Sequence, residues 1–436
     1  MWCETCAASR DYPMPVFALV DCNNFYASCE KLFRPDLKDT PVVVLSNNDG
    51  CVVARSREAK LLGIKMGVPV FQIKSEMQRH GILAFSSNYA LYADLSSRVM
   101  RTLEEMAPRV EVYSIDEAFL DLTGIESAIS IVEFGQQVRE RIGHWIGITV
   151  CVGIAPTKTL AKLANHAAKK YPATQGVVDL TNPDRQRRLL ALVPVDDVWG
   201  VGRRLSKRLN ALGITTALDL ANASPRAIRD QFSVVLERTV RELNGESCIE
   251  LEEIPPTKKQ IVCSRSFGVK VTHYELLREA VCEYATRATE KLRKEQQQAK
   301  VLTVFIRTSP FKDNEPQYSN SASGELLIPS CDTRDFIELA NRLLKRIWKD
   351  GFRYAKAGVM LSDFYDPGMF QPGLFDDVST RSNSQQLMSV LDTINQSGAG
   401  KVFFAGQGTK KDWSMMKREH LSPAYTTRWD QLPRVK

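Results

Sequence analysis

The chain has no apolar run long enough to cross a membrane. Its longest, residues 146–155, falls short of the roughly 20 residues that a transmembrane helix needs. The N-terminus also lacks the apolar core of a secretory signal and carries Glu4 and Asp11 instead. The chain also has no strong excess of charge, because 58 basic and 51 acidic residues leave a net charge of only +7. A net charge of this size permits a polyanionic partner but does not require one. We therefore predict a soluble, cytoplasmic protein without membrane contact.

Disulfide and metal-ligand patterns are also scarce. The 10 cysteines are scattered through predicted strands and helices of a 436-residue chain, which is typical of reduced thiols. Cys3 and Cys6 form the only Cys-x-x-Cys pair, so a zinc site is not expected. The 5 histidines do not cluster with cysteines or acids at ligand spacing, and we expect structural or surface roles for them. Residues 1–13 precede Met14, an alternative start, and are expected to be an extension without a role.

What the sequence does contain is three carboxylates beside strand-like runs. Asp116 and Glu117 separate the runs 110–115 and 118–122, as the two turn residues of a β-hairpin would. Asp21 ends an apolar run that is typical of a buried strand. Each acid alone is explained equally well by a solvated turn or a strand-end cap. Together at neighbouring strand ends they would be costly without a cation, and their hard oxygen atoms suit Mg²⁺.

The order of predicted elements indicates several domains. Residues 14–183 alternate strand-like and helical runs, which predicts an α/β region. Residues 184–250 are helical and basic, and 251–260 form a linker with a Pro-Pro pair. Residues 261–365 follow the order β-α-β-β-α-β of a known α+β unit. The polar composition of residues 366–436 predicts a flexible tail with docking segments.

A glycine-containing turn precedes a basic helix within residues 184–250. Gly200 and Gly202 lie in the sequence VWGVG, and Arg203 and Arg204 follow directly. In a helix-hairpin-helix element such glycines let backbone N–H groups approach a phosphate. A packing corner between two helices would explain the same glycines. The adjacent basic residues favour contact with a DNA backbone, which positions a protein without reading sequence.

Three motifs in this order and spacing resemble the Y family of DNA polymerases. They are DCNNFYASCE at 21–30, SIDEAF at 114–119 and CVGIAPTKTLAKLA at 151–164, and the resemblance runs from about Met14 to the C-terminus. Three further segments resemble the UmuC-type branch of that family, with its plasmid-borne and mobile-element relatives: LSNNDGC at 45–51, SSNYALYAD at 86–94 and LSPAYTTRW at 421–429. The branch is associated with error-prone translesion synthesis in the SOS response to DNA damage.

This resemblance implies a multidomain α/β and α+β fold shaped like a right hand. The implied domains are a palm at 14–33 and 87–183, small fingers at 34–86, a helical thumb with helix-hairpin-helix at 184–250, a linker at 251–260, a little finger at 261–365 and a tail at 366–436. The implied reaction is template-directed nucleotidyl transfer, with primer–template DNA and deoxynucleoside triphosphates as substrates.

The resemblance also implies the site residues. Asp21, Asp116 and Glu117 are the implied catalytic carboxylates, and with the backbone carbonyl of Cys22 they would hold two Mg²⁺ ions. Such ions activate a hydroxyl and neutralise a leaving pyrophosphate.

For the nucleotide pocket, Tyr26 is implied as the steric gate, a ring that collides with a ribose 2′-OH. Phe25 is implied beside the sugar and triphosphate. Lys60 and Lys162 match residues that contact the triphosphate, which chemistry supports because charge on the phosphates must be neutralised. Arg57 is implied as a further nucleotide-binding residue with a phosphate contact, although some relatives have a tyrosine at this position.

The segment QPGLF at 371–375 resembles a sliding-clamp binding motif. Gln371 would enter a polar notch, and Leu374 and Phe375 an apolar pocket, although Pro372 replaces the commoner aliphatic residue. A chance match is the alternative. The UmuC-type branch further implies a UmuD′-type dimer and a RecA filament as partners.

Other functions remain open at this point. A polymerase IV-type enzyme that acts alone is the alternative within the family. A helix-hairpin-helix DNA-binding protein without catalysis would need the basic segments but not three acids. A metal-dependent nuclease or nucleotide cyclase would use the acids but not the implied triphosphate lysines.

Overall fold

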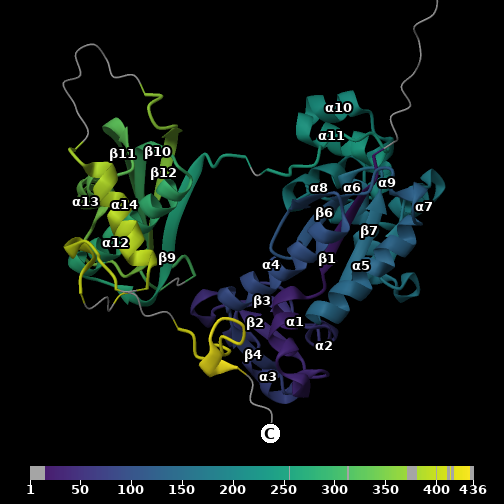
Figure 1. The fold of residues 1–436 in the computed structure, drawn as a ribbon, viewed down its shortest axis with the longest axis horizontal. Helices are drawn as coiled ribbons and strands as arrows, with labels where there is room; N and C mark the ends of the chain where they lie inside the picture. Colours follow the sequence, from purple (N-terminus) through teal and green to yellow (C-terminus); the bar gives the residue numbers. More distant parts are fainter. Residues whose placement is uncertain are drawn as a thin grey trace, which may run out of the picture. The chain divides into compact units, whose positions relative to one another are not determined.

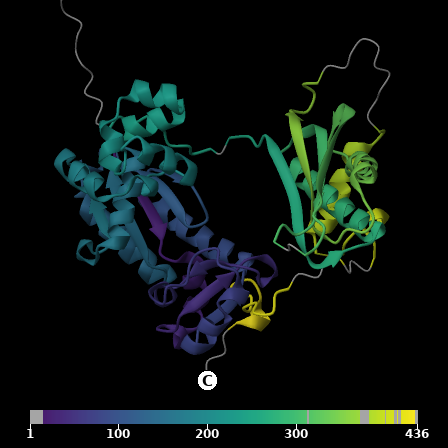
Figure 2. The same cartoon turned by 180° about the vertical axis from the view of Figure 1, so that it is seen from behind.

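The computed structural model describes residues 15–254, 256–311, 314–370, 381–398, 400–409, 413 and 417–432. They form two compact units (Figures 1 and 2). The first takes in the described residues of Met1–Leu45, Cys51–Pro255 and His420–Lys436, and the second those of Ser46–Gly50 and Pro256–Glu419. The predicted extension at 1–13 and the predicted clamp-binding residues Gln371, Leu374 and Phe375 lie outside the described residues.

A five-stranded sheet is the centre of the first unit, with the order β5-β6-β1-β7-β8. Its strands are β1 (Phe17–Cys22), β5 (Arg109–Val112), β6 (Glu117–Asp121), β7 (Val150–Ala155) and β8 (Val177–Asp179). The middle strand β1 pairs antiparallel with β6 and β7 and is buried along its whole length. A strand covered on both faces requires a continuous apolar run, which explains why β1 shows no polar alternation before Asp21.

Alternate residues of these strands face two different cores. Ala18 and Val20 join a core with α1 (Phe25–Leu32), α4 (Tyr89–Met106) and α5 (Ile131–Ile146). Phe17 and Leu19 join a second core with α6 (Lys158–Lys170) and the helices that follow it. The period of two along a strand thus places different helices on the two faces of the sheet.

Gly153 lets α6 approach β7 closely. A Cβ atom at this position would lie only 2.1 Å from the backbone N of Asn165, so any larger residue would push the helix away. Asn165 also donates side-chain hydrogen bonds to the carbonyls of Leu19 (3.2 Å) and Cys151 (2.7 Å). These contacts fix α6 against β1 and β7 at the place where the candidate site lies.

The fingers region predicted at 34–86 has a small sheet and core of its own. The sheet order is β3-β2-β4, with β2 (Val42–Leu45), β3 (Val52–Arg55), β4 (Leu83–Ser86) and the helices α2 (Arg57–Leu61) and α3 (Lys74–His80). The basic helix α2 ends before Gly63, whose φ of +79° suits glycine.

The region predicted to be a helical thumb consists of five described helices. They are α7 (Pro183–Leu192), α8 (Arg203–Ala211), α9 (Ala217–Asn222), α10 (Pro225–Gln231) and α11 (Val234–Leu243). Asn182 caps α7 through its side chain, and Pro183 follows at the first helical position, where no backbone donor is needed.

The second unit confirms the predicted β-α-β-β-α-β order. Its elements are β9 (Gln260–Val271), α12 (Tyr274–Lys294), β10 (Gln298–Arg307), β11 (Ser319–Ser330), α13 (Thr333–Ile347) and β12 (Tyr354–Tyr365). The strands form an antiparallel sheet of order β11-β10-β12-β9, and α12 and α13 share one core with it. This core is separate from those of the first unit.

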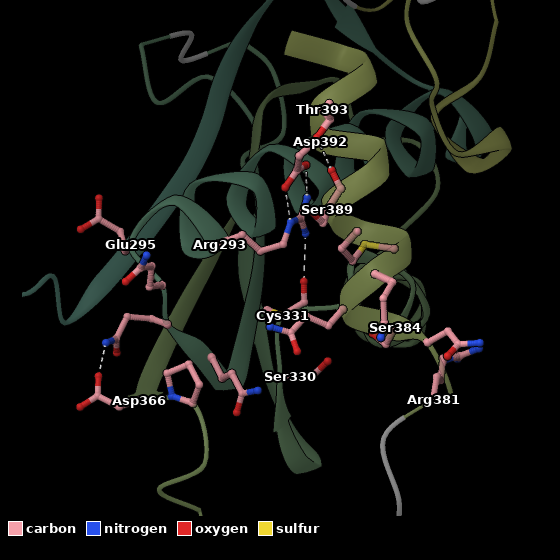
Figure 3. Close-up of a pocket in the computed structure, with 18 of the residues that line it drawn as sticks. Arg293, Glu295, Ser330, Cys331, Asp366, Arg381, Ser384, Ser389, Asp392 and Thr393 are labelled. Carbon is pink, nitrogen blue, oxygen red and sulfur yellow. Dashed lines mark hydrogen bonds and ion pairs between the residues drawn. The ribbon is translucent and has the colours of Figure 1, made fainter. Parts of the chain in front are cut away.

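The composition of residues 366–436 predicted a flexible tail, but the described residues of this segment include a packed helix. Helix α14 (Ser384–Gln396) packs beside α12 and α13, and Figure 3 shows Asp392 of α14 facing Arg293 of α12 across two hydrogen bonds of 2.7 Å. The two residues line a polar cavity of about 950 Å³. This polar segment can therefore pack as a helix, because its charged groups contact groups of opposite charge on the neighbouring helix. None of the described helices has the length and apolar character needed to cross a membrane.

Candidate active site

The predicted hairpin is present, but its turn is longer than two residues. The Ser114 hydroxyl accepts hydrogen bonds from the backbone N–H groups of Asp116 (3.2 Å) and Glu117 (3.1 Å) and donates one to Asp116 Oδ1 (2.7 Å). Backbone N–H groups of Tyr113 and Ser114 donate to the Glu117 carbonyl. The prediction of an Asp-Glu turn is therefore wrong in detail, because the Ser114 side chain supports a wider turn that leaves Glu117 as the first residue of β6.

This register sets Glu117 opposite Asp21 on the neighbouring strand. Asp21 is only 7% exposed, and its carboxyl group hydrogen-bonds to that of Glu117. Burial raises the pKa of Asp21 to about 7, and Glu117 adds to the rise although Lys169 opposes it. Burial alone would raise the pKa of Glu117 as well, but the bonds from Asp21 and Lys162 lower it below its usual value. The pair thus shares a proton, as two close carboxylates do when no metal cation lies between them.

Asp116 lies on the turn beside this pair. Its backbone carbonyl accepts a hydrogen bond of 2.8 Å from the N–H of Cys22. The Cys22 thiol is buried, and its pKa is raised by that burial and by the charges of Asp21 and Asp116. Asp21 and Glu117 therefore pair across neighbouring strands, and Asp116 lies on the adjoining turn with its carboxylate bonded to Ser114.

Two lysines of α6 neutralise the carboxylate pair. Lys162 Nζ lies 2.9 Å from Glu117 Oε2, and Lys169 Nζ lies 2.5 Å from Asp21 Oδ2. Lys162 is also held over the ring of Tyr113, 4.4 Å from its centroid. Sequence reasoning singled out Lys162 and missed Lys169. The spacing of seven residues could have revealed it, because residues two helical turns apart share one face.

Lys60 of α2 belongs to the same electrostatic environment. Its pKa is lowered by partial burial and by the nearby charges of Arg55 and Lys169, while Asp21 opposes the shift. Arg57 lies exposed at the start of the same helix. The fingers and palm residues thus bring several cations to one side of the carboxylate pair, where a polyanion would be stabilised.

Phe25 and Tyr26 open helix α1 directly after β1. Phe25 is buried, whereas the half-buried Tyr26 ring stacks on Tyr92 with centroids 4.4 Å apart and planes at 16°. Burial raises the pKa of the Tyr26 phenol, and Tyr89 and the charge of Asp116 raise it further. The predicted gate residue therefore lies near the carboxylates, whereas Phe25 belongs to the hydrophobic core.

A cavity of about 260 Å³ lies beside the carboxylate pair. It is lined by Leu19, Asp21, Glu117, Lys162, Asn165, His166, Lys169, Asp197 and Trp199. His166 lines this cavity together with Asp21 and Glu117, because it lies on α6, which packs over β1. No group of three His, Cys, Asp or Glu side chains within the described parts of the chain is close enough to hold a metal ion.

The donors nevertheless fit a divalent metal. A buried acid that keeps a proton up to about pH 7 and hydrogen-bonds to a second acid offers hard oxygen atoms whose mutual repulsion a dication would relieve. Lysine ammonium groups take that role in the present arrangement.

The predicted DNA-binding residues lie at the start of α8. Gly200 has a φ of +87°, Gly202 is the N-cap of the helix, and Arg203 and Arg204 are exposed in its first turn. The first N–H groups of such a helix have no intrahelical acceptors and can bind a phosphate.

Family models match most of the chain. Residues 20–166 match the impB/mucB/samB family, 183–214 the HHH motif of the IMS family, 258–374 the C-terminal domain of the impB/mucB/samB family and 385–435 a domain of unknown function (DUF4113). Protein SamB and Protein UmuC of Salmonella typhimurium are each 61% identical over 423 residues, which are 97% of this chain and 100% of each relative. Protein MucB of Escherichia coli is 51% identical over 418 residues, 96% of this chain and 99% of that protein.

Among solved structures, a Y-family DNA polymerase chimera of Dbh and Dpo4 has the same fold, with a TM-score of 0.65 at 23% identity. The match covers 80% of this chain and 99% of the chimera. Sequence and fold agree, and the chain belongs to the impB/mucB/samB family of Y-family DNA polymerases.

Proposed function

We propose that this protein is an error-prone translesion polymerase of the SOS response, which extends primers on damaged DNA with deoxynucleoside triphosphates. The observation that carries the proposal is the Asp21–Glu117 pair in cross-strand register, with Lys60, Lys162 and Lys169 gathered around it. Carboxylates next to several lysines suit a reaction in which a metal and a triphosphate meet. The similarity to UmuC, SamB and MucB over nearly the whole chain supports the same function. A cytoplasmic location follows from a DNA substrate.

Asp21, Asp116, Glu117 and the Cys22 carbonyl would hold two Mg²⁺ ions. When bound, the ions supply Lewis-acid activation of the primer hydroxyl and neutralise the leaving pyrophosphate. Asp21 and Glu117 would hold the ions in their ionised form. Lys162 and Lys169, together with Lys60 and Arg57, would bind the phosphates of the incoming nucleotide.

Tyr26 acts as the steric gate for the sugar. Its ring is held flat against Tyr92 and therefore resists displacement by a ribose 2′-OH. Phe25 supports this from the core, beside the start of α1.

Gly200, Gly202, Arg203 and Arg204 bind the DNA backbone near the start of α8. Such binding releases counterions, so affinity falls as salt rises. Removing both arginine charges should make the slope of log affinity against log salt less negative by about two. Gel-shift titrations of primer–template at several salt concentrations measure that slope.

Partners complete the proposal. The sliding clamp would bind at Gln371, Leu374 and Phe375, and a UmuD′-type dimer and a RecA filament would assemble with the full chain. An exposed apolar row on α14, formed by Leu387, Val390 and Ile394, supports a protein partner on this part of the chain. Robust synthesis without any partner would favour the polymerase IV-type alternative.

Primer extension with Mg²⁺ tests the reaction itself. The Asp116→Ala/Glu117→Ala double variant should lose incorporation while it still binds primer–template, and the exposed Glu126→Ala should behave as wild type. Full extension by the double variant would exclude the mechanism. Wild-type protein that binds DNA without incorporating nucleotides would identify a binding protein, and shortened primers without pyrophosphate would identify a nuclease.

A further inference from the structure

Residues 420–425, here called the tail anchor, return to the first unit beside the helix that carries Tyr26. Figures 1 and 2 show the yellow C-terminal segment against the purple and indigo N-terminal part of the chain. The N–H of Ser86 donates to the His420 carbonyl (2.9 Å), and the His420 N–H donates to the Ser86 hydroxyl (3.1 Å). The tail anchor is thus bound through its backbone as well as through its side chains.

Ser422 contacts the start of α4, which carries Tyr89 and Tyr92. The side-chain amide of Asn88, the N-cap of that helix, donates to Ser422 Oγ at 2.9 Å and to the Ser422 carbonyl at 3.3 Å. Both residues are buried. The amide group of Asn88 therefore bonds to the tail anchor at one end and to the first turn of α4 at the other.

Ser422 also lies beside Glu30, a fully buried acid on α1. Glu30 Oε1 accepts a hydrogen bond of 2.5 Å from the Tyr92 hydroxyl. Its other oxygen, Oε2, has no hydrogen-bond donor among the residues that the structure describes. Burial raises the pKa of Glu30, and the nearby hydroxyl groups of Tyr92 and Ser422 oppose that rise. Ser422 therefore lies between Glu30 of α1 and the N-cap of α4, to which it is hydrogen-bonded.

Tyr425 supports the other end of α1. Its ring is 7% exposed and stacks on Phe33, which caps α1, with centroids 4.6 Å apart and planes at 16°. The tail anchor therefore contacts α1 at its C-cap Phe33 and α4 at its N-cap Asn88.

We propose that Ser422 and Tyr425 are positioning residues for the steric gate. The connection is short. Tyr26 stacks on Tyr92 of α4, and the N-cap Asn88 of that helix bonds to Ser422. Phe33, at the end of the helix that carries Tyr26, stacks on Tyr425. This inference rests on the proposed gate role of Tyr26, and it gives the C-terminal segment that matches a domain of unknown function a part in sugar selection. A gate ring that shifts by a fraction of its own width would admit a 2′-OH more easily.

The test uses the full chain and single-nucleotide incorporation opposite a template guanine, with kcat and KM measured for dCTP and for CTP. Ser422→Ala and Tyr425→Ala should each lower the dCTP/CTP ratio of kcat/KM by roughly three- to tenfold, as small misplacements of a binding group do. Tyr425→Phe keeps the stacked ring and should retain the ratio. Trp429→Ala, at a tail residue that is 90% exposed, should also retain it.

A double-mutant cycle separates positioning from general loss of structure. If the tail anchor acts through the gate, Tyr425→Ala should have no further effect on the dCTP/CTP ratio in a Tyr26→Ala background. An unchanged ratio in Ser422→Ala and Tyr425→Ala, with a ratio that falls in Tyr26→Ala, would overturn this inference and leave the gate intact. An unchanged ratio in Tyr26→Ala would overturn the gate and the inference with it.

Discussion

Two acidic residues near the site are buried from water. Asp21 and Glu30 are both buried acids, but they are stabilised differently: Asp21 by Glu117 and Lys169, and Glu30 by the hydroxyl groups of Tyr92 and Ser422. A buried charge must find such partners or remain protonated. The chemistry of each residue is thus set by its neighbours in the fold, which leads to two predictions.

Replacement of Lys169 by alanine should lower kcat/KM for dNTP incorporation by about 100-fold, the usual effect of losing one group that stabilises developing charge. The matched control is Lys170→Ala, whose side chain is exposed and lies over Tyr171 rather than Asp21. Steady-state single-nucleotide incorporation measures both variants. Equal losses in the two variants would show that α6 contributes only a general positive charge.

Replacement of Glu30 by glutamine should change how stability depends on pH. Burial raises the pKa of Glu30 above its ordinary value of 4.5, so the folded state keeps a proton that the unfolded state loses. The free energy of unfolding of the wild type therefore falls as pH rises from 4.5 through the folded-state pKa. Glu30→Gln should gain stability relative to wild type across that window and then stay level.

Urea unfolding at successive pH values from 4.5 to 8 measures this difference. The exposed control Glu126→Gln should run parallel to wild type. A Glu30→Gln curve that also runs parallel would show that Glu30 ionises normally in the folded protein.

Among the helices, α14 shows how a polar segment acquires a fixed place. Its attachment depends on Arg293, which donates to both oxygens of Asp392 and also to the Cys331 carbonyl. The hydroxyl of Ser384, the first residue of α14, donates to Asp332 at 2.6 Å. Met388 is the one buried side chain among the described residues of α14, so specific polar contacts hold the helix rather than an extensive apolar face.

Asp392→Ala should leave Arg293 partly buried without its partner and weaken the attachment of α14 by about 3 kcal/mol, near the lower end for a buried ion pair. Hydrogen exchange should become faster in residues 384–396 and stay unchanged in β10 and β12. Arg381→Ala, which removes a half-exposed ion pair with Asp335, should cost less than about 1 kcal/mol. Unchanged exchange of α14 in Asp392→Ala would contradict this account.

The whole molecule consists of two units with separate hydrophobic cores. The core built from α12, α13 and β9–β12 contains none of the residues that form the cores around β1. The chain joins the units at 255/256 and again at 419/420, and it also contributes Ser46–Gly50 to the second unit. Units with separate cores need not unfold together.

Differential scanning calorimetry of the full chain should therefore show two transitions. Asp392→Ala should lower the Tm of one transition only, because the ion pair lies wholly within the second unit. Glu111→Ala should lower only the other, because it leaves the buried Lys158 of the first unit without its carboxylate. A single transition that both variants lower equally would show that the units are energetically coupled.

The order of the elements and the candidate site residues could be predicted from the sequence. Buried strands, the β-α-β-β-α-β unit and the end of α2 at Gly63 depend on local periodicity and on backbone preferences that neighbouring residues express directly. Asp21, Asp116, Glu117 and Tyr26 were found because they lie in short motifs.

Which of these residues contact one another depends on the tertiary structure. The opposition of Glu117 and Asp21, the ion pair of Lys169, and the bond between Asn88 and Ser422 join residues from about 100 to more than 300 positions apart. Such contacts depend on strand register, helix orientation and the return of the C-terminal chain to the first unit. The local periodicity of the sequence does not reveal any of these. For that reason the acids of the site and Lys162 could be predicted, whereas the ion pair of Lys169 and the contacts of the tail anchor could not.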